Sequence, residues 1–147
     1  MIESSKPVKL NNVELEEMAI LMANAFANHQ NWVYTIPKIK RRVKALKHIF
    51  KMMYRIVNEY GYIFTVVKDN QTIGYITYMD VIEKKDITLK RILKTNGFLD
   101  LIKFLLNTNP VSLIKFSNYM KTYSAHVNSI YPKSIHLHST GINEHFR

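Results

Sequence analysis

The chain has 147 residues, a net charge of +10 and 47% hydrophobic residues, which is typical of a single globular domain over residues 1–147. Cysteine is absent, which excludes a disulfide framework, a thiolate zinc site and a cysteine nucleophile. No apolar run approaches the roughly 20 residues of a bilayer-spanning helix and no secretory signal is evident, so we expect a soluble, cytoplasmic protein without a membrane partner.

The first predicted helix runs from Val13 to Ala27. A polar lead precedes it and ends in a predicted edge strand at Pro7–Leu10. Asn11 or Asn12 suits the N-cap, and glutamates follow in the first turn, where the helix dipole favours negative charge. Apolar residues recur three and four positions apart, which predicts an amphipathic helix; they are Val13, Leu15, Met18, Leu21, Met22, Ala25 and Phe26.

A polar and aromatic segment follows from Asn28 to Thr35, and it includes Trp32 and Tyr34. It breaks the apolar spacing, so we predict a loop. Loops carry a disproportionate share of binding residues. Aromatic residues in a loop also commonly cover the core, and the segment alone leaves both interpretations open.

A second helix is predicted from Pro37, which suits a first turn, to Tyr60, with Gly61 as its stop. An apolar stripe lines one face, and the opposite face carries six basic residues: Lys40, Arg41, Lys44, Lys47, Lys51 and Arg55. A basic amphipathic helix can bind membranes or nucleic acid, but it is more often a core helix with a solvated face. The net charge likewise fits either an anionic partner or a lysine-rich solvated surface.

Two strands and then a helical segment are predicted next. The strands are Tyr62–Lys68 and Thr72–Met79, joined by a turn at Asp69-Asn70. Gly74 lies within the second strand, where glycine often marks a bulge or a close backbone approach. Three helices are then expected at 86–94, 98–106 and 111–128, with breaks at Asn96-Gly97 and at Asn107–Pro110.

The last predicted strand runs from Ile135 to Ile142. A period of two places one set of residues on one face, namely His136, His138, Thr140 and Ile142, and the other set on the opposite face. The spacing of His136 and His138 is one that zinc sites use, but the sequence offers no evident third ligand, so we predict no metal site.

The end of this strand resembles the fourth strand and the start of the acyl-CoA loop in GNAT N-acetyltransferases. The residues that match the family motif are Leu137, Gly141, Ile142, Phe146 and Arg147, while Glu144 stands where the motif favours proline. The order of helix, aromatic loop, helix, hairpin and helical segment also resembles that family. The chain ends at the first position of the loop that cradles the pyrophosphate.

The resemblance implies an α+β fold of the GNAT type. Helices would flank a mixed sheet, cut after the fourth strand, with a helical insertion at about 81–129. It also implies acetyl-CoA as the cofactor. Gly141, Ile142, Asn143 and Arg147 would bind the cofactor, and His136 or His138 would stand near the position of the family's general base.

The resemblance further implies an acceptor site formed by the segment after the first helix, with Asn28, Trp32 and Tyr34 as the substrate residues. The expected reaction is acyl transfer to a small-molecule or peptide amine, impaired in a chain without the phosphate loop. We expect a homodimer or association with a complementing C-terminal half, because a sheet that ends here exposes an edge. The alternatives are a non-catalytic interaction module and, less favoured, a basic nucleic-acid-binding domain with salt-dependent binding.

Overall fold

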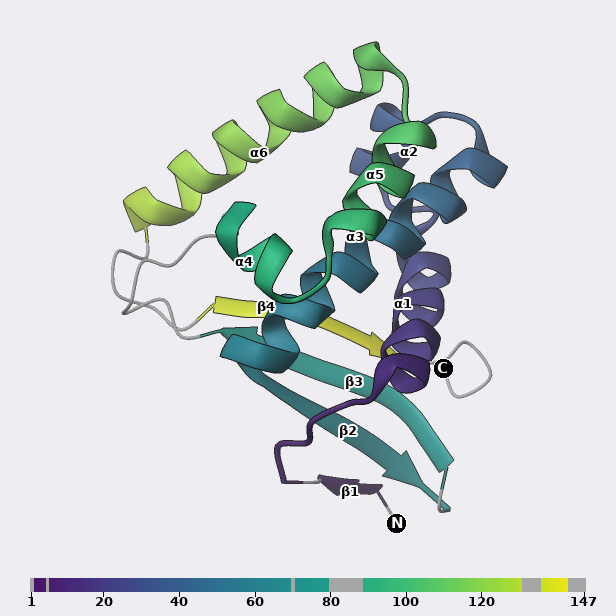
Figure 1. Ribbon diagram of the computed structural model, residues 1–147, viewed down its shortest axis with the longest axis vertical. Helices are drawn as coiled ribbons and strands as arrows, with labels where there is room; N and C mark the ends of the chain where they lie inside the picture. The colour runs from purple at the N-terminus through teal and green to yellow at the C-terminus, as the bar shows by residue number, and fades with distance from the viewer. Residues whose placement is uncertain (1, 5, 70, 80–88, 131–135, 143–147) are drawn as a thin grey trace.

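The computed structural model describes residues 2–4, 6–69, 71–79, 89–130 and 136–142 and shows an α+β fold (Figure 1). The described elements, in chain order, are β1 (Ile2–Ser4), α1 (Asn12–Phe26), α2 (Gln30–Thr35), α3 (Ile39–Tyr60), β2 (Tyr62–Lys68), β3 (Gln71–Met79), α4 (Leu89–Lys94), α5 (Phe98–Leu106), α6 (Pro110–Ile130) and β4 (His136–Ile142). None of the described helices combines the length and the apolar character needed to cross a membrane.

The sheet has the strand order β1-β2-β3-β4, and each of these pairings is antiparallel. The expectation of a mixed sheet therefore does not hold for the described strands. The register of β2 with β3 shifts next to Gly74, because Val66 pairs with Gly74 while Val67 pairs with Thr72. The bulge that glycine at this position predicted is thus confirmed.

Helices α1 and α3 pack against each other and cover one face of the sheet, with α1 next to β4 and α3 next to β2 and β3. The sheet contributes Ile63, Tyr75 and Thr77 to the buried layer under these helices. Helix α3 runs through the centre, and α5 packs against its other side (Figure 1). The core is therefore built around α3, as its long apolar stripe predicted.

The opposite face of the sheet carries an aromatic cluster. Tyr62 and Phe64 of β2 each stack on Tyr78 of β3, with ring centroids 5.0 and 5.6 Å from it. Tyr62 and Tyr78 are also paired in the strand register, so the contact is a direct cross-strand pair. These contacts hold β2 and β3 in register.

Three basic residues of α3 form ion pairs with acidic residues of the two neighbouring helices, α1 and α5. Glu16 of α1 forms ion pairs with Lys47 and Lys51. Asp100 of α5 forms an ion pair with Arg55, at 3.2 Å between Oδ2 and Nε. The interpretation of α3 as a core helix is therefore confirmed, and the solvated part of its basic face consists of Lys40, Arg41 and Lys44, which are exposed.

Most predicted elements have the bounds that the sequence indicated to within two or three residues, and two predictions were wrong. The segment before α1 contributes only an isolated bridge, between Val8 and Ile63, whereas the first strand lies earlier, at Ile2–Ser4. The segment after α1 contains a short helix, α2, in place of a loop. The helices expected between the third and fourth strands are confirmed as α4, α5 and α6.

Candidate functional site

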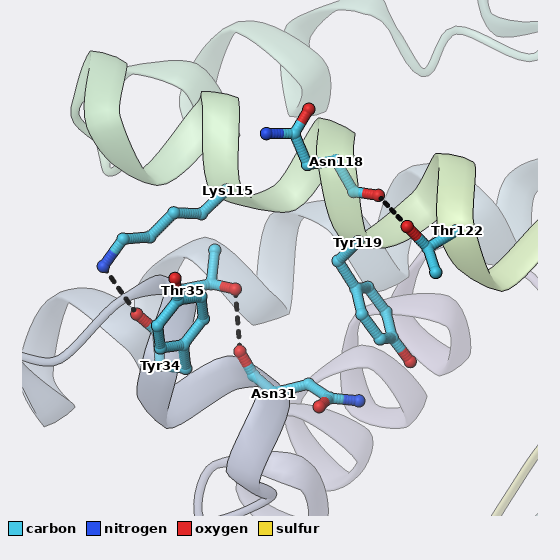
Figure 2. A pocket seen from close by; sticks show the side chains of 7 residues that line it. All are labelled: Asn31, Tyr34, Thr35, Lys115, Asn118, Tyr119 and Thr122. Atoms are coloured by element: carbon cyan, nitrogen blue, oxygen red, sulfur yellow. Dashed lines mark hydrogen bonds between the residues drawn. The ribbon is translucent and has the colours of Figure 1, made fainter.

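A pocket of about 300 Å³ lies between α2 and α6 (Figure 2). Three of its residues come from α2 and four from α6, which are separated by some eighty positions in the chain; they are Asn31, Tyr34, Thr35, Lys115, Asn118, Tyr119 and Thr122. The lining thus combines two tyrosine rings, amide and hydroxyl groups and one ammonium group. None of the described residues that line it carries a carboxylate or an imidazole.

The position of α2 depends on a buried arginine at the start of α3. Arg42 is 4% exposed, and its Nη1 donates hydrogen bonds to the carbonyl oxygens of Ile36 and Pro37, at 2.8 and 2.9 Å. These carbonyls belong to the link between α2 and α3. A buried charged donor that satisfies two loop carbonyls fixes the direction in which the chain leaves α2.

Aromatic stacking holds α6 against α2. The indole of Trp32 stacks on the ring of Phe116 with centroids 5.3 Å apart, and Phe116 meets Phe104 of α5 edge-on at 5.9 Å. Aromatic pairs in such geometries are worth about 0.5–1.5 kcal/mol beyond the burial of their area. Trp32 is therefore a structural support of the pocket and does not line it.

Lys115 is the only cation in the pocket lining. Its Nζ lies 4.2 Å from the centroid of the Tyr34 ring and 3.5 Å from the Tyr34 carbonyl oxygen. Figure 2 shows its side chain extending from α6 across to Tyr34, while Tyr119 reaches toward α2 further along α6. An ammonium group near the face of an aromatic ring at the edge of a pocket suits a ligand that carries an anionic group.

The two threonines of the pocket bond to their own helices. Thr35 Oγ1 donates to the Asn31 carbonyl at 2.7 Å, and Thr122 Oγ1 donates to the Asn118 carbonyl at 3.1 Å (Figure 2). Their hydroxyl oxygens keep acceptor capacity while their protons are engaged. Asn31, Asn118 and Tyr119 supply the remaining polar groups of the lining.

The predicted substrate residues have three different positions. Tyr34 lines the pocket, Trp32 supports it through Phe116, and Asn28 is exposed at the end of α1 and does not line it. The sequence interpretation missed the α6 half of the pocket. A signal was present, because Lys115, Asn118, Tyr119 and Thr122 recur at three- and four-residue spacing, which places them on one side of a helix.

The predicted catalytic histidines, His136 and His138, belong to β4, and none of the described residues that line the pocket comes from β4. The backbone register also departs from simple alternation. Thr77 pairs with Ser139 and Tyr78 with Leu137, so His138 is an extra residue on β4. A bulge at this position interrupts the period of two on which the expectation of one common face from His136 to Ile142 was based.

The predicted cofactor residues lie partly within the described chain. Gly141 and Ile142 pair with Tyr75 and Gly74 of β3, which places them at the end of β4 next to α1. Asn143 and Arg147 lie outside the described residues. The described part of the chain contains no group of three histidine, aspartate or glutamate side chains arranged to hold a metal ion.

A cluster of ionisable groups lies between α3 and α5, away from the pocket. Asp100 is 5% exposed, and its Oδ1 lies 3.4 Å from His48 Nδ1 while its Oδ2 accepts from Arg55. Burial lowers the pKa of His48 below 6.5, and the neighbouring Asp100 carboxylate opposes this shift only in part. The cluster joins two helices, α3 and α5.

Neither a scan against protein-family models nor searches of curated proteins and solved structures found a match for this chain.

Proposed function

We propose that the chain belongs to an acyltransferase of the GNAT type, which moves an acetyl group from acetyl-CoA to an amine. The observation that supports this most is the order of elements on the antiparallel sheet. Two helices, α1 and α3, cover one face, a hairpin follows, three helices are inserted, and β4 then returns beside β3. The residues that resemble the family's cofactor strand, Gly141 and Ile142, close this arrangement.

In this proposal the backbone of Gly141 and Ile142 receives the pantetheine arm of acetyl-CoA. Glycine at this position admits a ligand close to the backbone, because it has no Cβ. Asn143 and Arg147 would extend the cofactor site beyond β4. The catalytic role proposed for His136 or His138 is deprotonation of the acceptor amine, directly or through a water molecule.

The pocket between α2 and α6 would bind part of the acceptor. Because the described residues of its lining include no general base, it would hold a region of the acceptor remote from the reacting amine. Lys115 next to Tyr34 favours an acceptor with a carboxylate or phosphate group, and Tyr34 and Tyr119 favour a flat apolar portion. We therefore propose an anionic or zwitterionic acceptor, such as an amino acid or a peptide end.

The test is the release of coenzyme A from acetyl-CoA, followed with a thiol reagent. The chain has no cysteine, so the signal comes from released coenzyme A alone. L-Phenylalanine offers an amine, a ring and a carboxylate, and phenethylamine is the matched acceptor without the carboxylate. We expect faster release with L-phenylalanine, and loss of this preference in Lys115→Met, whereas Lys121→Met, outside the lining, keeps it. The absence of any acetyl-CoA-dependent product, whichever amine is offered, would reject the proposal.

A second candidate is a non-catalytic module that binds an anionic small molecule or peptide. It is favoured by the described residues of the pocket lining, none of which has an acidic or imidazole side chain. Binding of L-phenylalanine without binding of acetyl-CoA would support this candidate over the first.

A further inference from the structure

The helix α5 has an unusual distribution of apolar residues. Its buried side holds Asp100 and Phe104, whereas its solvent side holds five large apolar residues: Phe98, Leu99, Ile102, Leu105 and Leu106. Leu99 is 67% exposed and Leu106 is 79% exposed. A surface helix normally directs its apolar stripe to the core.

Contacts with α3 and α6 explain why the side of α5 with Asp100 and Phe104 faces the core. Asp100 is drawn inward by Arg55 and His48 of α3, and Phe104 packs against Phe116 of α6. Asp100 and Phe104 are four positions apart, so both lie on one side of the helix. This orientation leaves the leucine-rich side in solvent.

The apolar surface continues onto the helices on either side of α5. Leu89 and Leu93 of α4 and Val111 and Ile114 of α6 are also more than half exposed. Helices α4 and α5 both lie along α3, and the break between them is closed by the hydrogen bond from Gly97 N to Ile92 O at 2.8 Å (Figure 1). We call the exposed apolar residues of α4 and α5 the leucine surface. Patches of this kind mark contacts with proteins or membranes.

The charge around the leucine surface is uniformly positive. Across residues 89–130 the only acidic residue is Asp100, which is buried and paired, while six basic residues occur in the same span: Lys90, Arg91, Lys94, Lys103, Lys115 and Lys121. Lys90, Lys94 and Lys103 are exposed and belong to the same two helices as the leucine surface. Lysine stems of this length can lie along an apolar surface and keep their ammonium groups in the polar layer.

We propose that the leucine surface binds an anionic lipid bilayer, with α5 lying in the plane of the interface. Apolar residues on one side and lysines beside them are the features of interfacial helices, and each lysine near an anionic membrane adds about 1 kcal/mol of attraction. A second copy of this chain is disfavoured as the occupant, because two like-charged surfaces would face each other. The side chains of the leucine surface are also aliphatic and aromatic hydrocarbons, which suit acyl chains without directional partners.

The inference concerns binding at the membrane surface and not insertion across it. Helix α5 has 9 residues and a length of about 14 Å, less than half of a hydrocarbon core. The sequence expectation of no membrane partner was based on the lack of a spanning segment. A folded helix that exposes its apolar side does not require such a segment, and the inference does not depend on the proposed enzymatic function.

The test is sedimentation of the whole chain with lipid vesicles at moderate salt. One set contains equal parts of phosphatidylcholine and phosphatidylglycerol, and the other contains phosphatidylcholine alone. The double variant Leu99→Gln/Leu106→Gln removes the two most exposed leucines of α5. The matched control is Val13→Gln/Ile20→Gln, which makes the same kind of change at exposed positions of α1. Circular dichroism and analytical ultracentrifugation of each protein establish its folding and its oligomeric state.

We expect the wild type to bind the anionic vesicles and to bind the neutral ones at least roughly tenfold more weakly. Leu99→Gln/Leu106→Gln should lower the partition coefficient between water and the anionic vesicles roughly 100-fold, which is about tenfold for each leucine. Val13→Gln/Ile20→Gln should bind these vesicles as the wild type does. Equal binding to both vesicles, equal loss in both double variants, or no binding by the folded wild type would overturn the inference. Self-association that disappears in Leu99→Gln/Leu106→Gln would also overturn it and would identify a second copy as the occupant.

Discussion

The ion pair between Asp100 and Arg55 makes a quantitative prediction about the α3–α5 contact. Asp100→Asn keeps the shape of the side chain and removes its charge, which leaves Arg55 without its anionic partner. At 3.2 Å and an effective dielectric constant of about 20, the attraction is about 5 kcal/mol. The Arg55 side chain is 17% exposed, so solvent screens part of this attraction. We expect a loss of about 3 kcal/mol in the free energy of unfolding.

The assay is urea unfolding followed by circular dichroism, with thermal unfolding as a second measurement. For a domain of this size, a loss of about 3 kcal/mol lowers the Tm by roughly 6–12 °C. The matched control is Glu16→Gln, which removes the other carboxylate paired with α3. The Glu16 side chain is 31% exposed, against 7% for Asp100, so solvent screens its ion pairs more strongly and its loss should cost less than the loss of Asp100. A loss in Asp100→Asn no larger than that in Glu16→Gln would refute the reasoning that burial strengthens the α5 contact.

Three further predictions concern packing and pH. Gly61→Ala should cost about 1–3 kcal/mol in unfolding experiments, because its Cβ would lie 2.7 Å from the Tyr78 carbonyl oxygen. Gly97→Ala should cost less, because its nearest contact would be a side-chain atom, Cγ of Met52 at 3.0 Å, and the nearest backbone atom, Ile92 O, is 3.4 Å away. Burial lowers the pKa of His48 below 6.5, so the folded chain should lose stability as the pH falls below 6.5; His48→Gln should remove that part of the pH profile. Hydrogen bonds from Lys47 and then Lys51 lower the pKa of Glu16 from 4.5 to about 2, so Glu16 stabilises the fold above pH 4.5. This contribution should be lost as the pH falls from 4.5 to about 2, and it should be absent from the pH profile of Glu16→Gln.

Local sequence signals predicted most of the fold, because the determinants of these elements lie within a few residues. Asn11 caps α1 as expected and forms a reciprocal pair of hydrogen bonds with Glu14. The hairpin β2–β3 follows from β-branched runs on both sides of a two-residue turn. The α3 stripe predicted the central helix, with Leu46, Phe50 and Val57 buried.

The remaining features depend on contacts between distant residues. The orientation of α5 depends on Arg55, 45 positions away from Asp100, and no spacing rule within α5 indicates it. Helix α2 has no side-chain cap, and its position depends on Arg42 and on the stack of Trp32 with Phe116. The sequence could propose the α2 half of the pocket, but not its pairing with α6.

The measurement that tests the proposed function most directly is calorimetric titration of acetyl-CoA into the folded chain, with the oligomeric state recorded by light scattering. The proposal predicts saturable binding with a dissociation constant in the micromolar range and weaker binding in Gly141→Val, whose added side chain would obstruct the backbone of β4. The absence of binding in a sample that circular dichroism shows to be folded would contradict an acetyl-CoA-dependent function for this chain.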